Sequence, residues 1–153
     1  MCVSFFMVIS MNEKYMMLAI DEAKKAYKKN EVPIGCVIVK DGRIISKAHN
    51  KKEIKKNAIM HAEIIAIAKA CKKLKTWHLD DCILYTTVEP CMMCTGAIIQ
   101  SRIKKIYYSI SNKSFGELEN YHLKNKKIFI QNNILNEESK KLLQQFFKEK
   151  RKL

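Results

Sequence analysis

The chain contains little proline and little glycine, with two prolines and four glycines among 153 residues. This scarcity, together with a hydrophobic content of 48%, excludes collagen-like and low-complexity sequences and argues against disorder. The apolar segment at residues 1–10 is too short to span a membrane, and no basic residues precede it as in a secretory signal. We expect residues 1–10 to be an N-terminal extension, and residues 11–153 to form a single domain with its own core.

Acidic residues are also scarce: 15 Asp and Glu stand against 29 Lys and Arg, for a formal net charge of +14. A charge of this size on a small domain predicts a polyanionic partner, and nucleic acid is the favoured one. The excess of lysine accompanies many Ile and Asn residues, so an AT-rich genome is an alternative explanation of the same composition.

Cysteine is present but not in the pattern of a disulfide scaffold. Of the six cysteines, four have no paired spacing, and nothing resembles the dense framework of a small secreted protein. We therefore expect reduced thiols and a cytoplasmic location.

Hydrophobic periodicity predicts a mixed α/β domain. A helix is expected over residues 12–29, followed by strands at 36–39 and 44–46 that join at the turn pair Asp41-Gly42. Further along the chain we expect a polar loop at 50–59, helices from His61 and from Pro90, strands at 82–87, 103–109 and 127–130, and a C-terminal helix. This order predicts one mixed sheet with helices on both faces.

Two short segments about thirty residues apart carry the chemistry. His61-Ala62-Glu63 and Pro90-Cys91-Met92-Met93-Cys94 together supply one imidazole, two thiols and one carboxylate. His61, Cys91 and Cys94 are the ligand set of a catalytic zinc site with one position open for water, and Glu63 is a candidate proton carrier. Because both segments begin helices, we expect two helix N-termini to converge on one cation, where their dipoles favour thiolates.

A Cys-x-x-Cys pair also occurs as a redox pair or as half of a structural zinc site. A structural site needs a fourth ligand, for which Cys82, Cys71, His49 and His78 are candidates without an obvious spacing. Glu63 favours the catalytic alternative, because a closed site has no use for a carboxylate at that position.

These segments resemble the cytidine-deaminase-like superfamily, and within it the bacterial tRNA adenosine deaminases. The resemblance rests on Glu31-Val32-Pro33-Ile34-Gly35, Asn50, His61-Ala62-Glu63, the segment Glu89–Ala97, Ser101-Arg102-Ile103 and Phe146-Phe147. It implies a three-layer α/β/α fold, one Zn²⁺ per subunit, a homodimer, and hydrolytic conversion of adenosine to inosine at the wobble position of a tRNA anticodon stem-loop. It also implies that Asn50 binds the target nucleotide and that Val32 and Ile34 form pocket walls, although such residues also serve as turn or core residues.

The resemblance is incomplete after the strand at 103–109. Asn112 stands where the family usually carries an aspartate that contacts RNA beside the target base, and the stretch 114–127 is shorter than usual. In the last helix, Phe146 and Phe147 suit stacking on anticodon-loop bases or packing in the core. The basic end that follows them, Lys148, Lys150, Arg151 and Lys152, suits phosphates or plain solvation.

Two other functions remain open from the sequence. A deaminase of free bases or nucleosides, such as guanine or cytosine, would use the same zinc chemistry. A noncatalytic, zinc-stabilised RNA-binding module would account for the charge but not for Glu63.

Overall fold

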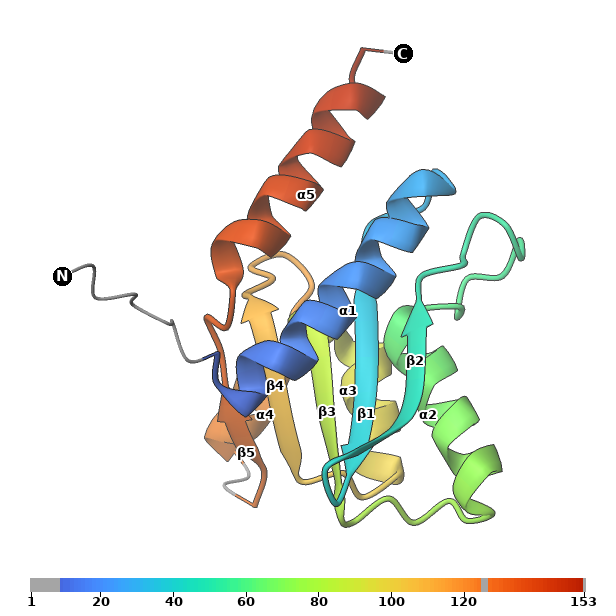
Figure 1. Cartoon of the computed structure of the whole chain (residues 1–153), viewed down its shortest axis with the longest axis vertical. Helices are drawn as coiled ribbons and strands as arrows, with labels where there is room; N and C mark the ends of the chain where they lie inside the picture. Colours follow the sequence, from blue (N-terminus) through green and yellow to red (C-terminus); the bar gives the residue numbers. More distant parts are fainter. Residues whose placement is uncertain (1–8, 125–126, 153) are drawn as a thin grey trace, which may run out of the picture.

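A five-stranded mixed sheet forms the centre of the protein in the computed structural model, which describes residues 9–124 and 127–152 (Figure 1). The strand order is β2-β1-β3-β4-β5; β1 runs antiparallel to both β2 and β3, whereas β3, β4 and β5 are parallel. The elements in chain order are α1 (Met11–Lys28), β1 (Gly35–Lys40), β2 (Arg43–His49), α2 (Ala62–Leu74), β3 (Cys82–Val88), α3 (Met92–Gln100), β4 (Lys105–Ile110), α4 (Leu118–Lys124), β5 (Phe129–Gln131) and α5 (Asn136–Lys150).

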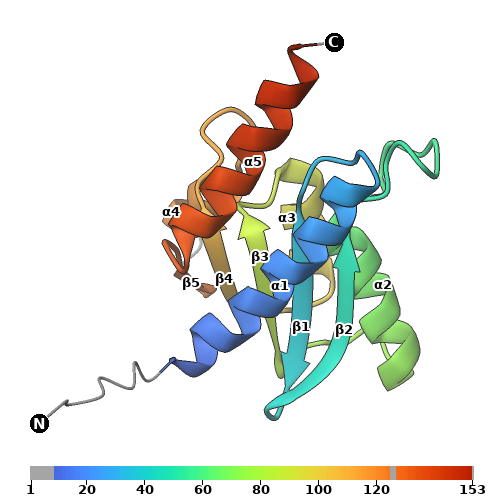
Figure 2. The ribbon, with the colours of Figure 1, turned by 45° about the horizontal axis from the view of Figure 1, so that its top comes forward.

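Helices cover both faces of this sheet, as the sequence predicts. Helices α1 and α5 lie on one face, and α2 and α3 lie on the other (Figures 1 and 2). An apolar cluster under α1 includes Tyr15, Met16 and Val37, and a larger one under α2 and α3 includes Leu84 and Ile98. The three-layer α/β/α architecture is thereby confirmed.

Local sequence signals explain the first half of the fold. Ser10 and Glu13 form a reciprocal capping box at the start of α1, which stabilises that helix end. The β1–β2 hairpin turns at Asp41 and Gly42, both of which have positive φ angles, as a tight hairpin turn requires. The capping residue Ser10 lies within the expected N-terminal extension, most of which (residues 1–8) is outside the described residues.

The second half departs from the expected elements in three places. The stretch after Ser114 contains the short helix α4, which the sequence analysis missed because its seven residues include little apolar periodicity. The last strand occupies Phe129–Gln131, slightly later than expected. Helix α3 begins at Met92 and not at Pro90, because Cys91 has extended backbone angles (φ −70°, ψ 176°) and serves as the N-cap. No described helix is long and apolar enough to cross a membrane.

Gly35 allows α1 to pack directly on β1, and we expect Gly35→Ala to lower the free energy of unfolding by about 3 kcal/mol. The reason is steric, since a Cβ at Gly35 would lie 1.9 Å from the carbonyl oxygen of Ala19 and 2.6 Å from the amide nitrogen of Ala23. Urea unfolding measures this loss. Gly96→Ala is the matched control, because no atom lies within 4 Å of its Cβ position; it should stabilise α3 by up to about 1 kcal/mol. Equal stability of the two variants would contradict the packing argument.

Candidate active site

The N-termini of α2 and α3 bring the three predicted metal ligands together. His61 is the N-cap of α2 and Cys91 is the N-cap of α3, while Cys94 lies in the first turn of α3. The Nδ1 atom of His61 lies 3.7 Å from Sγ of Cys91 and 3.6 Å from Sγ of Cys94. The predicted convergence of two helix ends is therefore present in the fold.

The donor distances fit a tetrahedral zinc ion. Zinc bonds of about 2.0 Å to nitrogen and about 2.3 Å to sulfur, at a tetrahedral angle, place the two donor atoms about 3.6 Å apart. Among the described residues, the cluster contains His61, Cys91 and Cys94 and no fourth His, Cys, Asp or Glu ligand. The candidates for a closed site, namely Cys71, Cys82, His49 and His78, all lie outside it. A metal held here therefore keeps one position for water.

The close contacts within the cluster shift the pKa values of the two thiols in opposite directions. Hydrogen bonds from Cys94 and His61 lower the pKa of Cys91 to about 3, whereas the Cys91 thiolate, burial and the carboxylate of Glu63 raise the pKa of Cys94. The hydrogen bond with Cys91 also raises the pKa of His61. Metal binding to this cluster would therefore release a proton from Cys94 and stabilise both sulfurs as thiolates.

Glu63 lies directly beside the cluster and is 4% exposed. Its Oε2 atom is 3.5 Å from Sγ of Cys94, and its Oε1 atom is 3.4 Å from the hydroxyl oxygen of Thr86 on β3. Burial raises the pKa of Glu63 above its ordinary value, which brings this carboxyl group closer to the neutral range where proton transfer in both directions is efficient. Thr86 was not identified from the sequence, where it is one of several residues of a buried strand.

Asn50 is buried at the end of β2 and is held through its backbone. Its amide nitrogen donates to the carbonyl oxygen of Ile34 at 3.1 Å, and its Nδ2 atom lies 3.5 Å from Oε2 of Glu31. The side-chain oxygen of Asn50 is buried without a hydrogen-bond partner among the described residues, so it retains the capacity to accept a hydrogen bond. This free acceptor fits the predicted contact with a nucleotide.

Glu31 organises the loop that follows Asn50. Its carboxylate is fully buried and accepts hydrogen bonds from the amide nitrogens of Ile54 at 2.7 Å and Glu53 at 3.2 Å. The sequence analysis used Glu31 only as a mark of the family resemblance. Its structural role is to hold the 50–59 loop, which connects Asn50 to His61.

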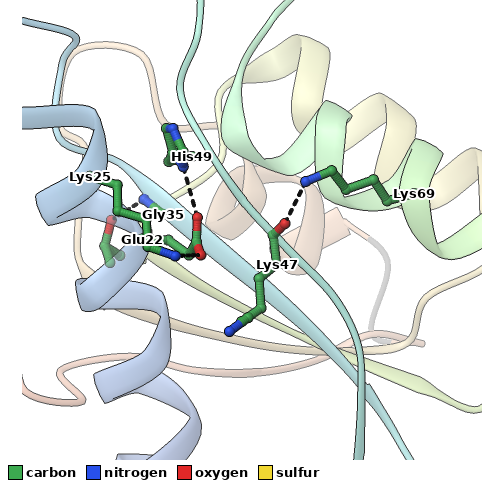
Figure 3. A network of polar contacts seen from close by, with 7 residues as sticks. Glu22, Lys25, Gly35, Lys47, His49 and Lys69 are labelled. Carbon is green, nitrogen blue, oxygen red and sulfur yellow. Dashed lines mark hydrogen bonds and ion pairs between the residues drawn. The ribbon is translucent and has the colours of Figure 1, made fainter. Parts of the chain in front are cut away.

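A second buried carboxylate ties the end of β2 to α1 (Figure 3). The two carboxylate oxygens of Glu22 accept hydrogen bonds, one from Nδ1 of His49 and one from Nζ of Lys25, each at a distance of 2.7 Å. Burial acts to raise the pKa of Glu22, but the hydrogen bonds from Lys25 and His49 outweigh it and leave the pKa below its usual value. On the other side of β2, Lys69 of α2 donates to the carbonyl oxygen of Lys47. The strand end that presents Asn50 is thus held from both layers.

One cavity of about 540 Å³ collects four of the five remaining predicted substrate contacts. Val32, Ile34, Asn112 and Phe147 all line it, together with Val88 at the end of β3. Phe146 does not reach this cavity: it is 6% exposed and packs edge-on against Tyr27 of α1. Of the two aromatic residues, Phe147 is therefore the one that offers an exposed ring.

Asn112 is fixed by its own loop and by Glu89. Its Oδ1 atom accepts from the amide of Phe115, and its backbone amide donates to Oε2 of Glu89 at 3.0 Å. The other oxygen of Glu89 accepts from the amide nitrogen of Glu119 in the first turn of α4. Glu89 thereby connects the segment that carries Cys91 to the loop that carries Asn112. Its position immediately before Pro90-Cys91 was the only available sequence signal.

We expect Glu31→Gln to loosen the 50–59 loop, because a Gln side chain has one oxygen in place of two and its buried NH2 group would face a backbone N–H donor. The cost should be about 1–3 kcal/mol. Hydrogen exchange of the Ile54 amide measures local opening, and urea unfolding measures the total loss. Glu53→Gln changes an exposed carboxylate of the same loop and should leave both quantities unchanged. Unaltered exchange at Ile54 in the Glu31 variant would refute the anchoring role.

Comparisons with known proteins agree with this site. Residues 10–151 match the family model of the MafB19-like deaminases. A tRNA-specific adenosine deaminase of Bacillus subtilis is 41% identical over 150 residues, which cover 94% of this chain and 93% of the relative.

A solved structure from a study of A-to-I editing by tRNA:A34 deaminases superposes with a TM-score of 0.81 at 34% identity, covering 85% of this chain and 99% of that one. The guanine deaminase of Bacillus subtilis gives a TM-score of 0.64 at 39% identity over 71% of this chain and 73% of its own. The chain therefore belongs to the deaminase family and, within it, to the tRNA-specific adenosine deaminases.

Proposed function

We propose that this protein hydrolyses adenosine to inosine at the wobble position of a tRNA anticodon, with Zn²⁺ held by His61, Cys91 and Cys94. The observation that carries the proposal is the buried carboxylate of Glu63, which lies 3.5 Å from a sulfur of a three-ligand cluster. A structural metal site needs neither an open position nor a neighbouring carboxylate. Membership of the tRNA-specific adenosine deaminases supports the choice of substrate.

Zinc in this site would act as a Lewis acid that makes water a nucleophile at neutral pH. Glu63 would take one proton from the attacking water and give it to N1 of the purine ring, and it would then move the second proton from the new C6 hydroxyl to the amino group, which leaves as ammonia. Its raised pKa suits both steps, because the carboxyl group must gain and lose the proton in each cycle. The two helix N-termini stabilise the negative charge of the thiolates around the reacting centre.

The cavity lined by Val32, Ile34 and Asn112 would hold the adenosine after it is splayed out of the anticodon loop. Asn50 would use its unpaired oxygen to accept a hydrogen bond from the nucleotide. Val32 and Ile34 would contact the base, Asn112 would lie beside it, and the exposed ring of Phe147 would stack on an adjoining base. Phe146 would support Phe147 from the core.

Guanine is the rival substrate, since a guanine deaminase shares 39% identity over much of the chain. Incubation of the zinc-loaded protein with a tRNA that carries adenosine at the wobble position, and separately with free adenosine, cytidine and guanine, distinguishes the two functions. Inosine formed only in the tRNA supports the proposal. Turnover of guanine alone would overturn it.

We expect Glu63→Gln to lower kcat on this tRNA by about a thousandfold while zinc remains bound, because the variant keeps the ligands but cannot carry the proton. Single-turnover inosine formation and metal analysis by mass spectrometry measure the two effects. As a control for the metal site, Cys91→Ala should lose zinc, whereas Cys71→Ala, outside the cluster, should retain it. Full activity of the Glu63 variant would show that the proton carrier is a different group.

We also propose the homodimer and the cytoplasmic location that the family resemblance implies. The outer face of α2 and α3 is a suitable dimer surface, because Ile67, Trp77 and Ala97 line a shallow apolar cavity of about 470 Å³ there. Trp77 is 56% exposed in the single chain. Sedimentation of the zinc-loaded protein should show a dimer, and Ala97→Glu should convert it to a monomer. A wild-type monomer at micromolar concentration would refute this assignment.

A further inference from the structure

Five lysines lie on segments at one end of the molecule. They lie on two segments far apart in the sequence, the end of α1 and the 50–59 loop, which the views show at the same end of the molecule (Figures 1 and 2). We call this group the lysine rim; its members are Lys29, Lys51, Lys52, Lys55 and Lys56. We propose that the lysine rim binds the phosphates of the anticodon-loop nucleotides next to the target adenosine, an inference that rests on the proposed tRNA substrate.

The lysine rim is strongly positive, because Glu53 is the one acidic residue of the 50–59 loop. No ion pair joins any of its five lysines to a carboxylate in residues 9–124 and 127–152. The buried carboxylates nearby are engaged elsewhere: Glu31 accepts from backbone amides, and Glu22 binds His49 and Lys25. Their charges therefore do not compensate the rim by direct contact.

Repulsion among neighbouring lysines of the rim supports the proposal that an anion binds there. Partial burial lowers the pKa of Lys51, and the proximity of Lys69, Lys29 and Lys55 lowers it further. Cations held this close without a partner gain free energy when an anion displaces water between them. A phosphate chain is the ligand that supplies several negative charges at once.

The loop presents its lysines from a rigid backbone. Besides the two hydrogen bonds to Glu31, the amide of Lys51 donates to the carbonyl oxygen of Met60, and that of Lys55 donates to the carbonyl oxygen of Lys51. Asn57 and Lys56 make further turn hydrogen bonds within the loop. A preformed loop loses little conformational entropy when it binds.

A second cavity, which Lys29 of the lysine rim lines, adjoins the substrate cavity. This cavity, of about 530 Å³, is lined by Lys29, Ile54, Phe147 and Lys150, and it shares Val32 and Phe147 with the substrate cavity. A nucleotide strand that leaves the substrate cavity past Phe147 thus comes within reach of lysines on both sides.

The test uses the zinc-loaded protein and a fluorescent tRNA anticodon stem-loop. Lys29→Gln/Lys55→Gln should raise Kd roughly tenfold near physiological salt, and it should make the slope of log Kd against log salt shallower by about 1.5, which corresponds to two phosphate contacts. Lys55→Glu, a single charge reversal on an exposed loop, should weaken binding as well. Thermal unfolding checks that the variants fold.

Lys72→Gln/Lys105→Gln is the matched control, because it removes the same charge from exposed positions in the last turn of α2 and at the start of β4, and these segments lie at the opposite end of the molecule (Figure 1). Its Kd and salt slope should remain those of the wild type. If the rim and control variants bind equally well while wild type forms inosine in tRNA, the lysine rim is not an RNA site, and an acidic protein partner becomes the alternative. If wild type forms no inosine in tRNA, the proposed function fails instead, which the activity assay shows before any variant is made.

Discussion

The meeting of two helix N-termini at one point is the constraint on which the rest of the structure depends. His61 and Cys91, as N-caps, bring an imidazole and a thiol together, and Cys94 adds a second thiol from the first turn of α3. A buried carboxylate beside two sulfurs is unfavourable in an apolar core. Here the dipoles of α2 and α3 offset the repulsion, and a divalent cation would offset it further. The sheet is what keeps the two helices aligned, because both pack on the same face.

Three buried carboxylates around this centre each hold a neighbouring segment in place through hydrogen bonds. Glu31, Glu89 and Glu22 each lie in the interior, and each satisfies both of its oxygens with amides, an imidazole or an ammonium group. Each therefore fixes a segment that carries or adjoins a proposed substrate contact: the 50–59 loop, the loop of Asn112, and the end of β2 before Asn50. The acidic residues that remain are too few to neutralise the surface. This division leaves the positive charge on the outside, at the mouth of the cavity.

The sequence predicted the elements whose signals are local. The α1 helix, the Asp41-Gly42 turn and the alternation of helix and strand all depend on near neighbours, and each is confirmed. The predictions were less accurate from Pro90 onward. There α3 starts two residues late because Cys91 adopts an extended backbone, and α4, in which Leu118 is fully buried, is too short to show a periodic pattern.

For the site, residue types and spacing determined the chemistry: one imidazole, two thiols and one carboxylate in two short motifs have few other uses. The family resemblance pointed to Asn50 and to the walls of the pocket. Tertiary structure alone decided which residues share a cavity, since Val32, Asn112 and Phe147 come from three distant segments. It also decided that Phe146 faces the core while Phe147 faces solvent, because packing against Tyr27 selects one of two adjacent rings. Such choices depend on contacts between segments far apart in the chain, and periodicity along the sequence does not record them.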